Sequence, residues 1–214
     1  MTELTTRLDN QPAIDPDLPP DPSRRTWVAT ACAVGGVAGV ATAVPFVGSF
    51  APSEKARAAG APVEVDVSGI APGELRTVEW RGKPVWLMRR TAAQLADLKT
   101  LDSKLADPDS DRPGYTPDFA KNEHRSRTPD LFVAIGICTH LGCSPTPELA
   151  PTPVPGVPSD WKGGYFCPCH GSYFDLAGRV YKNVPAPDNL EVPPYVISDD
   201  GGKVIVGIDE NDKA

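Results

Sequence analysis

The sequence predicts a mainly β, antiparallel head domain tethered to one N-terminal transmembrane helix. Valines alternate with acidic residues over 63–67, which is the period-two pattern of a half-buried strand. Two β-prone runs, 77–80 and 85–88, flank Arg81-Gly82-Lys83-Pro84, an arrangement typical of a hairpin. Residues 26–53 carry no charged side chain. As a helix, the run 26–50 would be about 37 Å long at ~1.5 Å per residue, which is enough to cross a bilayer.

Composition limits the classes of protein that this chain can belong to. A hydrophobic content of 40% in 214 residues leaves room for one modest packed core plus appendages. The chain has 25 Pro and 19 Gly, so much of the backbone must be turn and loop, although the share stays below that of disordered chains. The net charge of −7 gives no attraction to phosphate backbones and argues against nucleic-acid binding.

The N-terminal part of the chain predicts an anchored, exported protein. Residues 1–25 are polar and Pro-rich, and we interpret them as a cytoplasmic tail. Arg24-Arg25 directly precede the apolar run, as in twin-arginine export signals. We expect a transmembrane anchor over 26–50, a hinge linker or short helical turn over 51–61, and a periplasmic head over 62–214. The alternative is a secretory signal cleaved near Ala56-Arg57-Ala58.

Inside the head, local patterns predict further elements. Thr91 with Gln94 forms a capping box, and leucines at 95, 98, 101 and 105 recur at helical spacing, so we expect a helix that ends before Pro108. The apolar run 131–137 suits a buried strand. Residues 203–208 follow the turn 199–202 and predict another strand.

Cysteine and histidine are clustered in two loops. Four of the five Cys and two of the three His lie between positions 138 and 170. Loop 138–143 and loop 167–174 each offer one Cys, one His and a second Cys. Two thiolates and two imidazoles suit a tetrahedral zinc site as well as a mixed-ligand iron–sulfur cluster. The additional Cys pair favours the cluster, because a disulfide between the loops would hold them together in an oxidising compartment.

The two loops resemble those of the Rieske iron–sulfur proteins, and the whole chain is similar to the Rieske subunit of bacterial ubiquinol–cytochrome c reductase. The similarity extends from the anchor through Asn183-Val184-Pro185-Ala186-Pro187 to Pro194-Tyr195. It implies a Rieske-type head with a small cluster-binding subdomain, built from loops 138–143, 167–174 and 183–187. It also implies one [2Fe–2S] cluster, with Cys138 and Cys167 on one iron and His140 and His170 on the other. The remaining pair, Cys143 and Cys169, would form a disulfide.

The resemblance also implies roles for the residues around the cluster, which are Leu141, Gly142, Gly171, Ser172, Phe174 and Pro185. Ser172 corresponds to a serine whose hydroxyl bonds a bridging sulfide, and Leu141 to an apolar residue that docks the head. Pro185 belongs to a third loop that covers the cluster. Phe174 stands where many relatives have a Tyr that donates to a ligand sulfur. Because Phe174 cannot donate, we expect a lower cluster potential.

The implied function is electron transfer in a membrane complex. Ubiquinol held in a cytochrome b subunit would give one electron to the cluster and one proton to His170. The electron would pass to a c-type cytochrome, within a dimeric complex of the bacterial inner membrane. The connection 144–166 contains six Pro and is longer than the usual connection in the family. We expect it to form a loop on the surface. The alternatives are a membrane-tethered Rieske ferredoxin serving another oxidoreductase and a zinc-binding structural module.

Overall fold

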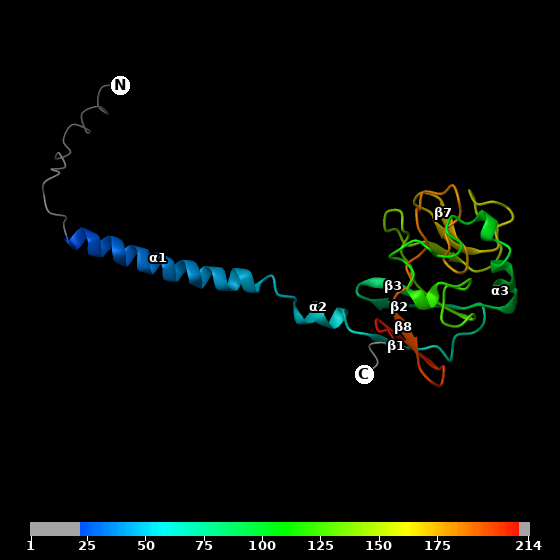
Figure 1. The fold of residues 1–214 in the computed structure, drawn as a ribbon, viewed down its shortest axis with the longest axis horizontal. Coiled ribbons are helices and arrows are strands. Elements are labelled where there is room, and N and C mark those ends of the chain that lie inside the picture. The colour runs from blue at the N-terminus through cyan, green and yellow to red at the C-terminus, as the bar shows by residue number, and fades with distance from the viewer. Residues whose placement is uncertain (1–21, 210–214) are drawn as a thin grey trace, which may run out of the picture. The chain divides into compact units, whose positions relative to one another are not determined.

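The computed structural model describes residues 22–209 and separates into two units, divided between Ser53 and Glu54. In the first unit, helix α1 spans Pro22–Gly48 (Figure 1). It begins four residues before the predicted anchor, because proline is well suited to the first helical position and lets the helix include the two arginines. Its described side chains are all exposed, and the helix is long and apolar enough to cross a membrane. Most of the predicted tail, residues 1–21, lies outside the described residues.

The second unit starts with a short helix and continues into the β head. Helix α2 covers Glu54–Ala59, so the segment 51–61 contains the helical turn that the sequence had left as one of two possibilities. The strands are β1 Val63–Asp66, β2 Leu75–Trp80, β3 Lys83–Arg89, β4 Leu131–Ile135, β5 Thr146–Glu148, β6 Gly164–Cys167, β7 Ser172–Phe174, β8 Tyr195–Ile197 and β9 Lys203–Val206.

These strands form three antiparallel sheets of three strands each, ordered β1-β9-β8, β2-β3-β4 and β5-β6-β7. The predicted antiparallel β head is confirmed. Figure 1 shows β7 at one end of the head, with β1 and β8 at the other. The sheet β5-β6-β7 carries the second Cys/His loop between β6 and β7.

The hairpin β2–β3 is confirmed and is longer than predicted. Trp80 pairs with Lys83, so the turn contains only Arg81 and Gly82. Both have positive φ, 53° and 72°, as a type I′ turn requires. Pro84 therefore lies inside β3, opposite Glu79.

The core joins the sheet β2-β3-β4 to the sheet β5-β6-β7. Side chains of β3 and β4, including Leu87, Met88 and Phe132, are fully buried. Trp86 of β3 stacks on Tyr165 of β6, with ring centroids 4.8 Å apart. This aromatic pair packs the sheet β5-β6-β7 against β3.

The leucine pattern yields a shorter helix than predicted. The capping box of Thr91 and Gln94 is present, but α3 ends at Leu98 (Ala92–Leu98). Arg179 donates to the Leu98 carbonyl at 2.8 Å and to Asp102 at 2.9 Å. These bonds satisfy the end of the helix, and the chain continues in a 3₁₀ helix, Asp102–Lys104. A second 3₁₀ helix covers Asp118–Ala120.

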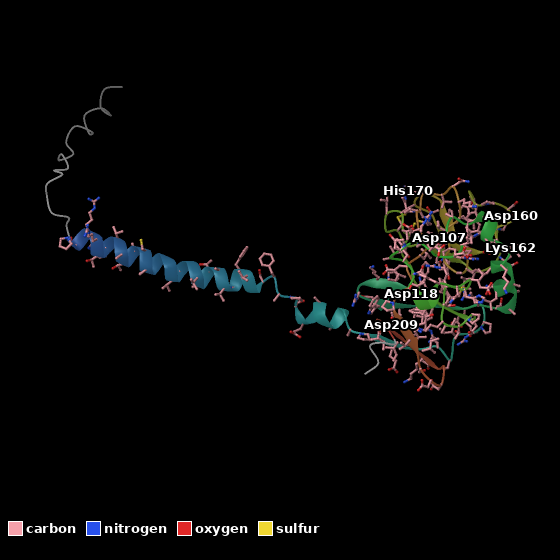
Figure 2. The ribbon with its side chains drawn as sticks, viewed as in Figure 1. Asp107, Asp118, Asp160, Lys162, His170 and Asp209 are labelled. Carbon is pink, nitrogen blue, oxygen red and sulfur yellow. A yellow bond between two sulfur atoms is a disulfide. The ribbon has the colours of Figure 1, made fainter. Side chains whose placement is uncertain are left out.

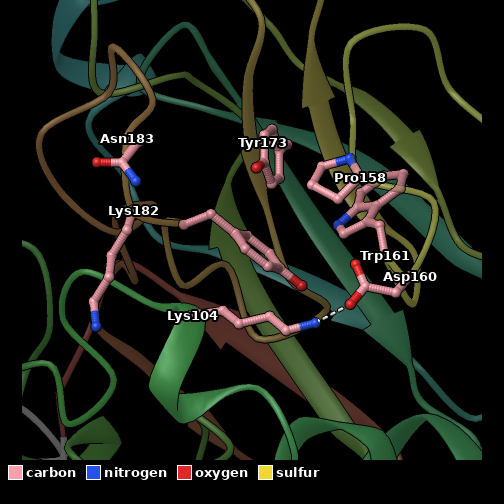
Figure 3. A pocket seen from close by; sticks show the side chains of 8 residues that line it. Lys104, Pro158, Asp160, Trp161, Tyr173, Lys182 and Asn183 are labelled. Carbon is pink, nitrogen blue, oxygen red and sulfur yellow. Dashed lines mark hydrogen bonds and ion pairs between the residues drawn. The ribbon is translucent and has the colours of Figure 1, made fainter.

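The connection 144–166 is only partly the surface loop that we expected. It contains β5, and its Trp161 is 4% exposed. Trp161 packs near Tyr173 and Tyr181, and Asp160 forms an ion pair with Lys104. Figure 3 shows these side chains around a small cavity. The aromatic contacts tie the Pro-rich connection to the outer face of β7.

Candidate metal centre

The two Cys/His loops share one local backbone design. Cys138 lies three residues after β4, and Cys167 is the last residue of β6. In each loop the N–H of a glycine four residues later donates to the cysteine carbonyl, at 3.1 Å for Gly142 and 3.0 Å for Gly171. Both glycines have positive φ, 83° and 76°. Glycine adopts this conformation without strain, so it lets each loop turn tightly after its cysteine.

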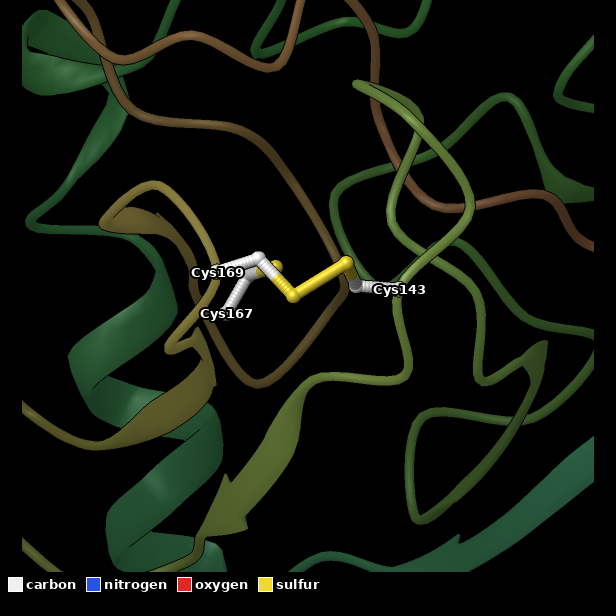
Figure 4. Close-up of side chains that lie close together, drawn as sticks. All are labelled: Cys143, Cys167 and Cys169. Carbon is white, nitrogen blue, oxygen red and sulfur yellow. A yellow bond between two sulfur atoms is a disulfide. The ribbon is translucent and has the colours of Figure 1, made fainter.

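A disulfide joins the loops, as the resemblance implied. Cys143 and Cys169 are bonded, with Cα atoms 6.7 Å apart, and Figure 4 shows Cys167 beside the bond. The Cys138 N–H donates to the Cys143 carbonyl at 2.7 Å. The hydrogen bond closes the first loop on itself, and the disulfide joins it to the second.

The other two head cysteines are buried thiols that face each other. Cys138 and Cys167 are free and each only 2% exposed, and their side chains are within hydrogen-bonding contact. Burial raises the pKa of Cys138 to about 11, against hydrogen bonds from the His140 backbone and the Ser172 hydroxyl that lower it. A thiolate pair at this place therefore needs adjacent positive charge, which a metal ion supplies.

The two histidines form a second pair, nearer to solvent. The rings of His140 and His170 are perpendicular, with centroids 4.7 Å apart. His170 is exposed and His140 half-buried, and Figure 2 shows His170 at the end of the head opposite Asp209. Among residues 22–209, the one compact group of potential ligands contains the sulfurs of Cys143, Cys167 and Cys169, and no imidazole nitrogen.

The donor set fits a two-iron cluster better than a single ion. Two of the three grouped sulfurs are bonded to each other, so in this state they are not ligands. What remains is a pair of buried thiols and a separate pair of imidazoles. A [2Fe–2S] group with two sulfur and two nitrogen ligands has that same division.

Residues beside the ligands position the loops. The Thr139 hydroxyl donates to the Asp188 carbonyl at 2.6 Å, and Arg112 donates to the Pro187 carbonyl. The Thr139 contact joins the first loop to the residue that follows the third loop, and the Arg112 contact holds the third loop from a segment outside both. The sequence analysis did not identify either residue. Thr139, between Cys138 and His140, could have been noticed from its position, whereas no pattern marks Arg112.

The residues predicted to surround the metal centre differ in their burial and in their contacts with it. The Ser172 hydroxyl accepts a hydrogen bond from the Ala186 N–H at 2.9 Å and contacts the thiol of Cys138. Leu141 is 71% exposed beside His140. Pro185 is exposed as well, so within the third loop it is Ala186 that is buried against the site.

Phe174 and Tyr173 lie on opposite faces of β7. Phe174 is fully buried in the same hydrophobic cluster as Cys138 and Cys167. Tyr173 packs instead against Tyr181, with centroids 4.7 Å apart. Tyr173 therefore does not replace the hydroxyl that Phe174 lacks.

Comparison with known proteins identifies relatives of this chain. Residues 119–194 match the Rieske [2Fe-2S] domain. The ubiquinol-cytochrome c reductase iron-sulfur subunit of Allochromatium vinosum is 54% identical, over 87% of this chain and 88% of that protein. The corresponding subunit of Rhodospirillum rubrum is 42% identical, over 83% and 88%. A solved structure described as a hyperthermophilic respiratory Complex III aligns with a TM-score of 0.44 and 28% identity, over 83% of this chain and 98% of that one.

The first of these relatives shares more than half of its aligned residues with this chain across most of both proteins. The matched Rieske domain contains both Cys/His loops, both buried thiols and the disulfide. The chain therefore belongs to the family of Rieske [2Fe–2S] iron–sulfur subunits of ubiquinol–cytochrome c reductase.

Proposed function

We propose that this chain is the electron-transfer subunit of a quinol:cytochrome c oxidoreductase. It would accept one electron from ubiquinol bound in a cytochrome b subunit and pass it to a c-type cytochrome. The names of the bacterial relatives support this assignment. The observation that carries it is that two loops joined by a disulfide carry a pair of buried thiols and a separate pair of imidazoles. The enzyme is the whole complex, and the chain is its electron carrier.

In this proposal Cys138 and Cys167 would hold one iron, and His140 and His170 would hold the other. The bound cluster supplies a one-electron acceptor whose potential is high, because neutral imidazoles replace two thiolates. Ser172 donates its hydroxyl toward the sulfur ligands, which spreads negative charge and further favours reduction. The disulfide keeps the two loops at the spacing that four ligands require.

His170 is the residue proposed to meet the quinol. Its ring is exposed, so it would accept a hydrogen bond from the quinol hydroxyl and take the proton as the electron leaves. Leu141, also exposed, would contribute an apolar contact to the cytochrome b surface around the quinol. Proton and electron would thus leave the quinol at one place.

The proposed membrane arrangement follows from the two units. Helix α1 would anchor the chain by a single pass in the bacterial inner membrane. The twin-arginine pattern and the disulfide favour a periplasmic head, because disulfides persist in oxidising compartments. Segment 51–61 would be the hinge that lets the head move between cytochrome b and the c-type cytochrome. We expect a dimeric complex, as in the family.

The test is purification of the tagged full chain from detergent-solubilised membranes. A cytochrome b and a c-type cytochrome should copurify and show ubiquinol–cytochrome c reductase activity. His170→Gln removes a proposed iron ligand together with the proton acceptor, so turnover should fall by about 100-fold or more, the least that loss of general-base catalysis alone would cost. His124→Gln, at a histidine outside the two loops, should leave turnover unchanged.

Other results would contradict the proposal. A cluster-containing chain that purifies without cytochromes would indicate a membrane-tethered Rieske ferredoxin serving another oxidoreductase. A colourless chain that contains zinc and no iron would indicate a structural zinc module.

A further inference from the structure

The third loop directs one backbone donor at the metal centre. Pro185 and Pro187 have no N–H, so Ala186, between them, carries the one amide hydrogen of the three residues. That N–H donates to the Ser172 hydroxyl at 2.9 Å. Ala186 is 4% exposed and lies in the same hydrophobic cluster as both buried thiols. The Ser172 hydroxyl in turn contacts the Cys138 thiol, so this one bond determines where the hydroxyl hydrogen points.

The two prolines make the loop stiff. The pyrrolidine ring fixes φ of each proline at about −65°. A proline also restricts the residue that precedes it, which for Pro187 is Ala186. The backbone of these residues therefore has few free rotations. A contact that fixes the Pro187 carbonyl should also fix the Ala186 N–H.

Arg112 makes such a contact. Its guanidinium donates to the Pro187 carbonyl and forms an ion pair with the Asp188 carboxylate at 3.4 Å. The carbonyl of Asp188 also accepts the bond from Thr139. A guanidinium presents several donors in a rigid fork, so one side chain can hold two neighbouring acceptors. Arg112 thus holds the two residues that directly follow Ala186.

The backbone that carries Arg112 is itself attached to the end of the third loop. The Asp107 carboxylate accepts the N–H groups of Asp111 and Arg112 at 3.0 and 3.4 Å. The Asn189 side chain, which is buried, donates to the Asp107 carbonyl at 2.9 Å. The two segments therefore form a closed ring of contacts. The guanidinium is the link in this ring that lies closest to Ala186 along the chain.

We propose that Arg112 is a positioning residue for the cluster. By fixing the Pro187 carbonyl, it keeps the Ala186 N–H on the Ser172 hydroxyl. The hydroxyl hydrogen is then directed toward the Cys138 sulfur. A hydrogen bond to a ligand sulfur favours the reduced, more negative state, so Arg112 raises the midpoint potential through Ser172 and not by its charge alone. This inference rests on the proposed role of Cys138 as an iron ligand.

The first experiment is a double-mutant cycle on the full chain in detergent, with the midpoint potential measured by redox titration and electron paramagnetic resonance. The four proteins are the parent, Arg112→Gln, Ser172→Ala and the double variant. Arg112→Gln should lower the midpoint. In the Ser172→Ala background no hydroxyl remains to be oriented, so the same substitution should have about half that effect or less. Arg112→Lys keeps the charge but not the fork, and it should also lower the midpoint.

Hydrogen–deuterium exchange tests the contact without reference to the cluster. In Arg112→Gln the peptide that contains residues 183–189 should exchange roughly 3- to 10-fold faster, because a hydrogen bond from a charged group is lost at a partly exposed site. Arg76→Gln is the matched control. Arg76 also donates to a backbone carbonyl, that of Asp66 at 2.8 Å, but it lies in β2. This control should change neither the exchange nor the midpoint.

Three results would overturn the inference. An equal fall of the midpoint for Arg112→Gln with and without the Ser172 hydroxyl would show that the guanidinium acts by charge alone. Full recovery of the parent midpoint in Arg112→Lys would show the same, even if Ser172→Ala fails to fold. Unchanged exchange of the 183–189 peptide would show that Arg112 does not hold the loop. A parent chain without a cluster would instead contradict the proposed function, and the exchange measurement would still test the contact.

Discussion

Alternate side chains of β7 serve two different parts of the head. Ser172 and Phe174 are buried on the side of the thiols, while Tyr173 faces the aromatic group around Trp161. The Ala186 N–H orients the Ser172 hydroxyl, which leaves its hydrogen free to donate toward sulfur. Phe174 fills the next inward position with a ring that has no donor. One substitution on this face therefore changes hydrogen bonding at the centre without changing the ring that packs there.

Phe174→Tyr should raise the midpoint potential of the cluster. A hydrogen bond to a ligand sulfur stabilises the reduced, more negative state, and about 1 kcal/mol of such preference corresponds to roughly 40 mV for one electron. The measurement is a redox titration followed by electron paramagnetic resonance. Tyr173→Phe, on the opposite face of β7, should leave the potential unchanged. An unaltered midpoint in Phe174→Tyr would show that the hydroxyl does not reach a ligand.

Gly164, the first residue of β6, is a position where only glycine fits. Its φ is +147°, and a Cβ there would lie 1.9 Å from the Phe174 carbonyl oxygen. Gly164→Ala must push β6 and β7 apart and should cost about 3 kcal/mol of unfolding free energy. Gly82→Ala is the control, because its φ is positive but nothing lies within 4 Å, and it should cost about 1 kcal/mol. Urea unfolding followed by tryptophan fluorescence measures both. Equal losses would contradict the close approach of the two strands.

At the scale of elements, buried arginine side chains fix loops that are not held by pairing with the short strands. Arg125 is fully buried and donates to the carbonyls of Ala177, Gly178 and Leu190. Arg179 pairs with Asp175 at 2.7 Å and also bonds the end of α3. Burial lowers the pKa of Arg125 to about 10, a cost that the carbonyl contacts offset. The segment after β7 is thereby fixed to the core by hydrogen bonds to side chains rather than by a sheet.

His124 belongs to the same network and should make stability depend on pH. Its side chain is 18% exposed, and its carbonyl accepts a bond from Arg90. Burial lowers the pKa of His124, although the nearby Glu123 acts in the opposite direction. The unfolded chain therefore binds the proton more readily, so stability should fall as pH drops below about 6.5, the ordinary histidine pKa.

The check compares the unfolding free energy of the parent chain and His124→Gln between pH 7 and pH 5. The other histidines are common to both proteins, so the difference isolates His124. The variant should lose less stability on acidification. Parallel pH profiles for the two proteins would refute the role of this histidine.

At the scale of the whole molecule, the structural features that could be predicted from the sequence are those that depend only on residues close together in the chain. The β2–β3 hairpin, the Thr91 cap and the helix formed by the charge-free run after Arg25 are local patterns, and the structure contains all three. Strands β5 to β8 have only three or four residues, too few for a periodic pattern, and their pairing fixes them. The leucine spacing overestimated α3, because Arg179, 81 residues from Leu98 along the chain, satisfies the end of that helix.

The candidate centre was easier to predict than the scaffold around it. Ligand types and their spacing are chemical requirements, so they are visible in the two loops themselves. The supporting contacts, such as Arg112 on the third loop and Trp86 on Tyr165, join segments distant in the chain. No local pattern marks them, because a contact of an arginine or an aromatic pair between distant segments is recognised only when the folded neighbours are known.

The central claim is that the buried thiols and the paired imidazoles hold a [2Fe–2S] cluster at the end of the head. The most direct test is iron and acid-labile sulfide analysis of the purified chain, with electron paramagnetic resonance of its reduced form, for Cys167→Ser beside Cys32→Ser. The parent chain and Cys32→Ser should contain two irons and two sulfides and give the same signal, which Cys167→Ser should lose. A signal that persists unchanged in Cys167→Ser would contradict the account.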